Sequence, residues 1–419
     1  MLNRREFLQM AAAGGAALAV SSSAAISAEP AGGGDGRSEA RMLSEHRVAK
    51  IESRGMQDRF PRSLGPNGKG NPVGGGGGYQ VQVITTDQGA SGWAMSSAKP
   101  EVAQKLVGAR LDGLFDLASG TTDLVPQEMD RAFHDLVGNI LQKPVYELLG
   151  GRGPREVALY SGAIYLEDVM PPDKPRGVRA VLDACQQDYE AGYRALKLKI
   201  GRGFKWMPGA AGLARDIEVT RSVRERFPDC RLLVDANDTY TVADMIRYVQ
   251  AVADCNLYWI EEPFEENRDD LKRLREAMAR CNCRALIADG EARKERAATP
   301  TAYGGYTQAF VDRLYALAAE KLVDVFVMDL GIVGFTRWRK IMPELVKAGV
   351  QASPHLWMWT PRPYYAAHLA AGVGNIDVLE GIPGKATGID YSAYTMKDGR
   401  LQVPRSPGFG LKLGPGERR

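Results

Sequence analysis

Charged side chains stand at the ends of seven apolar runs in the second half of this chain. They are Lys199, Asp235, Glu261, Glu291, Asp329, His355 and Glu380. Successive members lie 25 to 38 residues apart, which is the length of a repeating strand-loop-helix-loop unit. In a closed barrel of such units all strands end on the same face, so residues distant in sequence meet around one pocket. The spacing therefore predicts a barrel with a charged site at one end.

Helical periodicity fills the intervals between these runs. The predicted helices cover residues 178–191, 214–227, 241–253, 268–280, 307–321 and 336–348. Strands that alternate with helices of this length favour a parallel sheet with right-handed crossovers. An open doubly wound sheet would have a glycine-rich dinucleotide turn after its first strand, and none follows the expected first strand at 157–162. We therefore expect an α/β fold with a (β/α)7-8 TIM-like barrel over residues 155–381.

A smaller α+β domain is expected before the barrel, over residues 45–154. Its residues 46–53 and 79–86 have extended patterns, whereas residues 100–118 and 129–149 have apolar side chains at helical spacing. Between them lies a glycine-rich segment, residues 65–78. Lys69 in this segment lacks the glycine spacing and the following Ser or Thr of a phosphate-binding loop. Two interpretations stay open: a mobile lid over a pocket, or a disordered segment.

The N-terminus has the features of a targeting sequence. Arg4 and Arg5 form a twin-arginine pattern, and an alanine-rich apolar stretch at 10–20 leads to small residues up to Ala28. This stretch is about half the roughly 20 residues that a membrane-spanning helix needs. We expect a twin-arginine signal peptide at residues 1–28, a linker at 29–44, no membrane span, and export to the periplasm.

The charge distribution limits the partners of the protein. The formal net charge is +3, and the 54 basic and 51 acidic residues are spread along the chain. A nucleic-acid-binding domain would concentrate its basic residues in one patch. We therefore expect no nucleic-acid partner.

Three of the charged positions are carboxylates at the ends of consecutive strands: Asp235, Glu261 and Glu291. Carboxylates aimed at one point repel each other unless a cation neutralises them. Ligation by oxygen alone selects a hard ion, and Mg²⁺ fits a site with a few carboxylates and open positions for substrate oxygens. Asp289 competes with Glu291 as the third ligand, and the sequence pattern leaves the choice open.

The candidate bases come from different strands of the same ring. Lys197 and Lys199 alternate on one strand and so project to the same side. Their mutual repulsion is expected to lower the pKa of one lysine toward that of a usable base. His355 ends a later strand, and Asp329 or Asp324, one strand earlier, could orient it. Glu380 could donate a hydrogen bond to a developing oxyanion if it is held protonated.

Together these motifs resemble the enolase superfamily, and within it the mandelate racemase and muconate lactonizing enzyme group of acid-sugar dehydratases and racemases. The motifs follow in family order as Lys-x-Lys at 197–199, Asp-x-Asn at 235–237, Glu-Glu-Pro at 261–263 and Gly-Glu at 290–291. The resemblance implies that the N-terminal domain caps the barrel, that the C-terminal segment 382–419 returns to complete this domain, and that the protein is a homo-oligomer.

The resemblance also implies a reaction: metal-assisted removal of the proton next to a substrate carboxylate, through an enediolate held by Mg²⁺. The implied metal ligands are Asp235, Glu261 and Glu291; the implied catalytic residues are Lys199, His355, Asp329, Lys197 and Glu380; and Asn237 and Arg362 are expected to contact the substrate. In the family two adjacent glycines usually follow the aspartate, but here Gly331 and Gly334 are separated, so Asp324 remains an alternative to Asp329.

Two reactions share this first step. A dehydratase would expel the β-hydroxyl of an acid sugar to give a 2-keto-3-deoxy acid, whereas a racemase or epimerase would return the proton to the other face. The expected substrate is a small carboxylate, and dehydration is the favoured reaction. A cycloisomerase is disfavoured because such relatives usually have a lysine where His355 stands. A non-catalytic, exported sugar-acid-binding protein is the alternative from another class.

Overall fold

The computed structural model describes residues 36–291 and 295–414. The expected signal peptide, residues 1–28, lies outside these ranges. No helix within them is both long enough and apolar enough to cross a membrane.

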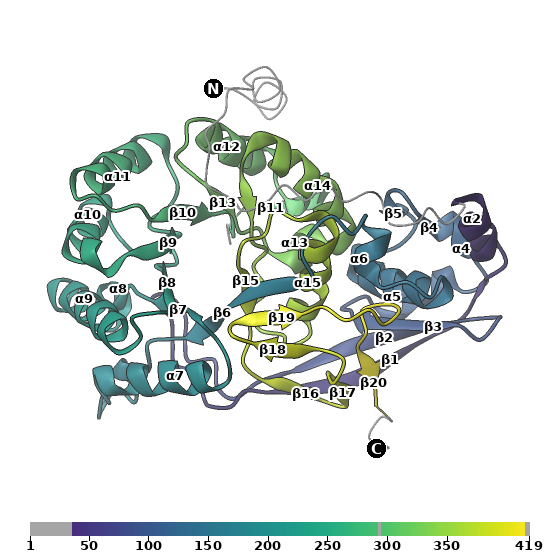
Figure 1. Ribbon diagram of the computed structural model, residues 1–419, viewed down its shortest axis with the longest axis horizontal. Helices are drawn as coiled ribbons and strands as arrows, with labels where there is room; N and C mark the ends of the chain where they lie inside the picture. The colour runs from purple at the N-terminus through teal and green to yellow at the C-terminus, as the bar shows by residue number, and fades with distance from the viewer. Residues whose placement is uncertain (1–35, 292–294, 415–419) are drawn as a thin grey trace.

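Eight parallel strands form a barrel within the described part of the chain (Figure 1). They are β6 Glu156–Ile164, β7 Ala195–Lys199, β8 Arg231–Asp235, β9 Leu257–Glu261, β10 Leu286–Asp289, β13 Val325–Phe326, β14 Gln351–Ala352 and β15 Leu379–Gly381. β6 to β14 pair in sequence order, and β15 pairs with β6. A hydrogen bond of 3.0 Å from Ala352 N–H to Asn375 C=O joins β14 to the segment that leads into β15. The predicted barrel is therefore confirmed.

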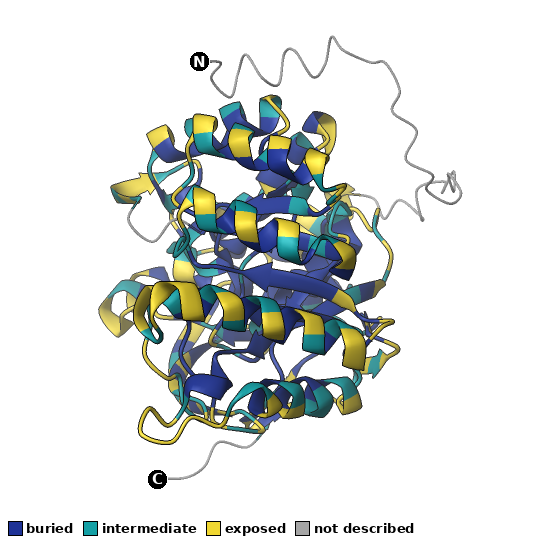
Figure 2. Cartoon of the chain, turned by 90° about the vertical axis from the view of Figure 1, so that its left-hand side faces the viewer, coloured by how far each residue is buried: buried dark blue, intermediate teal, exposed yellow. Residues whose placement is uncertain are grey.

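Helices surround the strands, and all of them except α15 have a buried inner face and an exposed outer face (Figure 2). They are α7 Val178–Glu190, α9 Gly209–Arg226, α10 Val242–Ala251, α11 Arg268–Arg280, α12 Gln308–Ala319, α14 Phe335–Ala348 and α15 Arg362–Val373. The side chains of Thr241, Asn267 and Thr307 each accept a hydrogen bond from a backbone N–H in the first turn of the helix that follows. Such caps satisfy backbone donors that the helix itself leaves unpaired and so fix where these helices begin.

The strand register determines which side chains face the barrel interior. Leu233 of β8 pairs with Lys197 of β7 and with Trp259 of β9. Paired residues in a parallel sheet point to the same side, and Trp259 and Leu233 belong to the apolar cluster that fills the barrel. Two residues further along each strand, the side chains that face the interior are those of Lys199, Asp235 and Glu261. The charged site thus begins where the apolar filling ends.

The capping domain is a four-stranded antiparallel sheet with helices on it. Its strands are β1 Val48–Arg59, β2 Gly78–Thr86, β3 Ser91–Met95 and β16 Lys385–Thr387, in the order β16-β1-β2-β3. α5 Asp130–Ile140 packs on β3 and α6 Val145–Leu148 packs on α15. β16 comes from the C-terminal segment, so the prediction of a capping domain completed from the C-terminus is confirmed. The same segment also reaches the barrel, where β19 Arg400–Gln402 pairs with the start of β6.

Part of the expected linker is a helix. α2, Gly36–Ser44, packs against α5 and against the short helix α4, Leu111–Leu114, and buries Leu43. Lys143 binds Glu39 of this helix. The prediction of a linker over 29–44 is therefore wrong from residue 36 onward. Although this segment is rich in polar residues, it forms an amphipathic helix that buries the side chain of Leu43.

Residues 100–118 do not form one helix. α3 Pro100–Ala103 continues into the 3-10 turn η1 Gln104–Leu106, and the chain then breaks at Gly108 before α4 and the short strand β4 Phe115–Asp116. Gly108 has a φ of +85°, a conformation that ends a helix and favours glycine. The sequence also did not predict the hairpin of β11 Arg296–Thr301 and β12 Gly304–Tyr306, which follows β10.

Asp135 joins three parts of the capping domain, and its loss is expected to destabilise the fold. It lies on α5, is buried, and accepts hydrogen bonds from Trp93 N–H on β3 (2.9 Å) and from Phe409 N–H in the C-terminal segment (2.8 Å). Asp135→Ala leaves both donors unpaired, so we expect the free energy of unfolding to fall by about 3 kcal/mol. Urea denaturation measures this. The exposed Asp123→Ala should change it by less than about 0.5 kcal/mol, and equal effects of the two variants would contradict the prediction.

Candidate active site

The predicted charged residues converge at the C-terminal ends of the barrel strands. Lys197 Nζ lies 2.6 Å from Glu261 Oε1, 3.3 Å from Asp235 Oδ2 and 3.6 Å from Glu380 Oε1. Lys199 Nζ binds Asp235 Oδ2 and lies 3.1 Å from Asn237 Oδ1. All six side chains are at least nine-tenths buried. The ring of charges expected from the strand spacing is therefore present.

The two lysines do not behave as a mutually repelling pair. Burial opposes the charged form of Lys197, but the carboxylates of Glu261 and Glu380 outweigh it and raise the pKa of Lys197 well above its ordinary value. Burial likewise opposes ionisation of Asp235, yet Lys199 and Lys197 lower the pKa of Asp235. Repulsion was expected to lower the pKa of one lysine of the pair; Lys197 is not that lysine, because three carboxylates lie within 3.6 Å of its ammonium group.

His355 is oriented by a carboxylate, as expected. Its Nδ1 lies 2.8 Å from Asp329 Oδ2, and the two residues form a parallel β-bridge. Asp324, the alternative partner, binds Arg275 and accepts a hydrogen bond from Ile287 N–H (2.8 Å), away from His355. Burial opposes protonation of His355, but the charges of Glu291, Glu380 and Asp329 raise its pKa to about 9.

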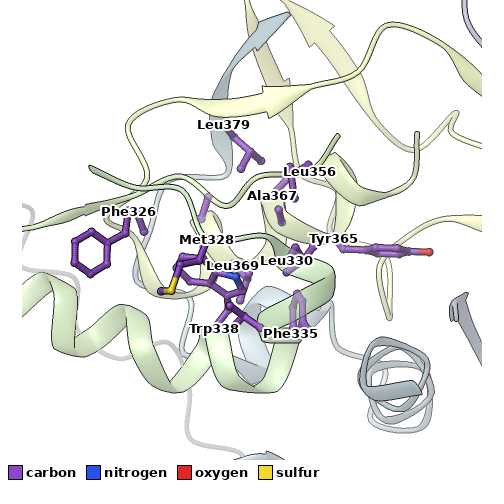
Figure 3. Close-up of a cluster of buried hydrophobic side chains, with 14 of the residues drawn as sticks. Phe326, Met328, Leu330, Phe335, Trp338, Leu356, Tyr365, Ala367, Leu369 and Leu379 are labelled. Carbon is purple, nitrogen blue, oxygen red and sulfur yellow. The ribbon is translucent and has the colours of Figure 1, made fainter. Parts of the chain in front are cut away.

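An arginine and an apolar cluster hold the dyad of His355 and Asp329 in place. Arg362 Nη1 lies 3.2 Å from Asp329 Oδ2 and 3.2 Å from Trp357 C=O. The neighbours of the dyad in the sequence, Leu330 and Leu356 among them, are fully buried in the cluster shown in Figure 3. The positive charge of Arg362 is thus paired with Asp329. The expected contact of Arg362 with a substrate stays a prediction.

Glu380 is held between two strands. Its Oε2 accepts a hydrogen bond of 2.6 Å from Leu356 N–H, and its Oε1 faces Lys197. A Cβ atom on Gly162 of β6 would lie 2.4 Å from Glu380 Oε1. Glycine is therefore needed at residue 162 for the carboxylate to occupy this place.

The strand register separates Asp289 from Glu291. Ala288 pairs with Glu261 and belongs to the interior cluster, so the side chain of Asp289 starts from the opposite side of β10. Gly290, with a φ of +128°, then turns the chain, and Glu291 Oε2 lies 3.7 Å from His355 Nε2. Glu291 is thus the residue that lies against the charged ring.

The carboxylates of the ring are chemically suited to a divalent cation. Glu261 Oε2 is buried and makes no hydrogen bond to the described residues. Buried carboxylate oxygens without a partner are costly, and an oxygen-only donor set suits Mg²⁺. Within residues 36–291 and 295–414, no three Asp, Glu, His or Cys side chains already surround one point as metal ligands. The ammonium groups of Lys197 and Lys199 lie against two of the carboxylates instead.

Sequence reasoning missed Tyr165 as a site residue. It follows β6, is 3% exposed, and its ring lies 5.0 Å from the ring of Trp357 (centroid to centroid) and 5.6 Å from Lys199 Nζ. Burial, together with the charges of Glu380 and Asp235, raises the pKa of Tyr165 well above its ordinary value. The first strand was expected to end at residue 162, whereas β6 runs to Ile164, so the residue that follows the strand end is Tyr165.

The glycine-rich segment is docked over the ends of β6, β7 and β8. Asn67 C=O accepts a hydrogen bond of 2.7 Å from Trp206 Nε1, and Lys69 Nζ lies 3.4 Å from Asp238 Oδ2. A Cβ atom on Gly68 would lie 2.7 Å from Thr239, so this glycine permits a close approach. The ordered contacts disagree with the disorder interpretation. Their position fits the lid hypothesis, and opening of the segment stays a prediction.

Comparison with known proteins agrees with this geometry. The family profile described as "Enolase C-terminal domain-like" matches residues 180–416. This chain belongs to the enolase superfamily. The structure of a galacturonate dehydratase from Geobacillus sp., complexed with D-galacturonate and 5-keto-4-deoxy-D-galacturonate, is 30% identical. It matches with a TM-score of 0.78 over 88% of this chain and 95% of that chain.

Two further relatives place the enzyme within the mandelate racemase and muconate lactonizing enzyme group. A protein of that name from Geobacillus sp. Y412MC10, complexed with magnesium and tartrate, is 29% identical and matches with a TM-score of 0.78 over 88% of this chain and 93% of that chain. The arabinonate dehydratase of Saccharolobus solfataricus is 24% identical over 301 residues, which cover 69% of each chain.

Gly162→Ala is expected to displace the carboxylate of Glu380 without unfolding the barrel. The new methyl group would overlap Glu380 Oε1, so the hydrogen bond to Leu356 N–H should be lost. If Glu380 stabilises the transition state, kcat/KM should fall about 10- to 100-fold, or about 1.4 to 2.8 kcal/mol. A crystal structure and steady-state kinetics check both effects. Gly113→Ala is the control, because no atom lies within 4 Å of its added Cβ; an unmoved Glu380 in the Gly162 variant would contradict the prediction.

Proposed function

We propose that this enzyme is a Mg²⁺-dependent dehydratase that removes water from an acid sugar to give a 2-keto-3-deoxy acid. The observation that supports the proposal most directly is the pair of bases around one charged ring: Lys199 on β7 and the dyad of His355 and Asp329 beyond β13 and β14. The galacturonate dehydratase relative was solved with a product that is a ketone at the carbon next to the carboxylate and lacks oxygen at the following carbon. Proton removal followed by loss of the β-hydroxyl gives this pattern.

The proposed metal ligands are Asp235, Glu261 and Glu291. Their strands are adjacent, and Asp235 pairs in register with Glu261. When bound, Mg²⁺ would supply positive charge for the substrate carboxylate as negative charge develops on it. The relative solved with magnesium and tartrate supports the choice of metal. Asp289 is the less favoured ligand because it starts on the far side of β10.

The side chains of the ring have separate tasks in the proposed reaction. Lys197 and Glu380 would hold the substrate carboxylate by charge and hydrogen bonding, which stabilises the transition state more than the substrate. His355 or Lys199 would remove the α-proton, according to the configuration of the sugar acid. Asp329 would keep the His355 ring oriented, and Asn237 would position Lys199 through its 3.1 Å contact. The β-hydroxyl then leaves as water.

Racemisation or epimerisation of an α-hydroxy acid is the second candidate. The strands of Lys199 and His355 are separated by two strands on one side of the barrel and by four on the other. Bases on different sides of a substrate can remove a proton from one face and return it to the other. The two reactions differ only after the proton has been removed, so their products distinguish them.

The exchange of the α-proton tests the proposed function. In D₂O with Mg²⁺, we expect the protein to act on at least one of D-galacturonate, D-arabinonate, D-galactonate and L-rhamnonate, seen by proton NMR as loss of the α-proton signal and appearance of a keto-deoxy product. Lys199→Ala or His355→Asn should lower the rate at least about 100-fold, which is typical for the loss of a positioned acid or base.

The controls separate the alternatives. Lys347→Ala, on the outer helix α14, should leave the rate unchanged. Exchange with inversion but no keto product would indicate the epimerase. Binding of a sugar acid without exchange would contradict an enzymatic role and favour the non-catalytic binding protein. Export by the twin-arginine signal and assembly as a homo-oligomer stay predictions from the sequence.

A further inference from the structure

Tyr165 stands beside Lys199 at the mouth of the barrel. β6 ends at Ile164, and Ile164 pairs in register with Leu198 of β7. The next residues along these two parallel strands are Tyr165 and Lys199, so the fold itself makes them neighbours. The 5.6 Å distance from Lys199 Nζ to the centroid of the Tyr165 ring shows this contact.

The phenol of Tyr165 is buried in the site and has no hydrogen-bond partner within the described ranges. Its ring is fixed by Trp357, with an angle of 31° between the two ring planes. The charges that act most strongly on its hydroxyl belong to the active-site ring: Glu380, Asp235, Lys197 and Glu291. Buried hydroxyl groups in folded proteins are almost always hydrogen-bonded. Tyr165 is only 3% exposed, and its hydroxyl makes no hydrogen bond to the described residues, so this hydroxyl is suited to bind a ligand group beside Lys199.

Lys199 and His355 are assigned to the α-proton in the proposed reaction. Lys199 Nζ is held by Asp235 and Asn237, and His355 Nδ1 by Asp329. Expulsion of a β-hydroxyl needs a proton donor in addition to the base that takes the α-proton. A phenol, with an ordinary pKa of about 10, meets this requirement.

We propose that Tyr165 is the catalytic acid that protonates the leaving β-hydroxyl. This inference rests on the proposed dehydratase function. A base of the ring takes the α-proton, and the electron pair of that C–H bond moves onto the substrate carboxylate to give an enediolate. As the carboxylate C=O bond re-forms, this pair makes the new C=C bond between the α- and β-carbons, and the C–O bond to the β-hydroxyl breaks. The O–H bond of Tyr165 breaks at the same time and its proton joins the departing hydroxide to give water. The base then releases its proton to solvent and the phenolate takes one back, so the substrate has lost one water and the enzyme is unchanged.

Tyr165→Phe tests the proposal because it removes only the hydroxyl and keeps the ring against Trp357. Wild type and variant are compared in D₂O with Mg²⁺, with D-galacturonate or whichever acid of the panel the wild type dehydrates. We expect the formation of keto-deoxy product to fall 10²- to 10⁴-fold, the range for loss of a general acid. Solvent deuterium should still enter the α-position of unreacted substrate, because the bases remain.

A substrate with a better leaving group provides the rescue. Fluoride leaves without a proton donor, so the variant should release it from the β-fluoro analogue, 4-deoxy-4-fluoro-D-galacturonate, at a rate within about threefold of the wild type. Deuterium incorporation and fluoride release also show that the variant is folded. The matched control is Tyr248→Phe, which removes an equally buried phenol hydroxyl that contacts Thr220 between α9 and α10 (2.7 Å) and should leave all rates unchanged.

Each other outcome contradicts the assignment. Unchanged dehydration by Tyr165→Phe would show that another group protonates the hydroxyl. Parallel loss of dehydration, deuterium incorporation and fluoride release would place Tyr165 in proton removal or folding instead. If the wild type neither exchanges nor dehydrates any acid of the panel, the proposed function itself fails, and that result is seen before any variant is made.

Discussion

The structure depends on the compensation of buried charge at one end of the barrel. Five carboxylates, those of Asp235, Glu261, Glu291, Asp329 and Glu380, share a site that is nearly closed to solvent. Two charges 4 Å apart interact by about 4 kcal/mol at an effective dielectric constant of 20, so like charges cannot gather there without cations. Lys197 and Lys199 neutralise part of this charge, and His355 and Arg362 neutralise more. An excess of carboxylate remains, which is what a divalent cation would balance.

The capping domain contributes to this site by fixing a loop of the barrel. Asp58 of β1 is fully buried and accepts hydrogen bonds from Thr360 Oγ1 (2.6 Å) and Thr360 N–H (2.9 Å). Between His355 and Thr360 lies Met358, whose φ of +89° is unfavourable for any residue other than glycine. Such a conformation persists only where the surroundings over-determine it. The cap therefore holds the loop that runs from His355 past Trp357 to Thr360, so both domains contribute to the site.

The ring of charges could be predicted from the sequence because a charged residue at the end of a buried strand seldom has a purely structural role. Seven such residues, spaced by one strand-helix repeat, are still harder to explain by structure alone. The sequence also predicted the barrel helices, whose caps and apolar stripes are local signals. It missed features that depend on contacts distant in the sequence. The helix at 36–44 is stabilised by packing on α4 and α5, and the break at Gly108 interrupts an otherwise helical pattern.

The upward shift of the pKa of Lys197 also depends on Glu380, which lies 183 residues away in the sequence. Tyr165 was overlooked because tyrosine is common in cores, and only the register of β6 against β7 places it beside Lys199. The register likewise separates Asp289 from Glu291, a choice that the sequence pattern alone leaves open.

A crystal structure of the protein grown with Mn²⁺, as an anomalous substitute for Mg²⁺, would show whether the ring of charges binds a divalent cation. We expect one anomalous peak per chain, bonded at about 2.0 to 2.2 Å to oxygens of Asp235, Glu261 and Glu291, with the ammonium groups of Lys197 and Lys199 turned away from these carboxylates. A peak bonded to Asp289 in place of Glu291 would correct the ligand set. No peak, with both lysines still against Asp235 and Glu261, would contradict the claim that this ring of charges is built around a divalent cation.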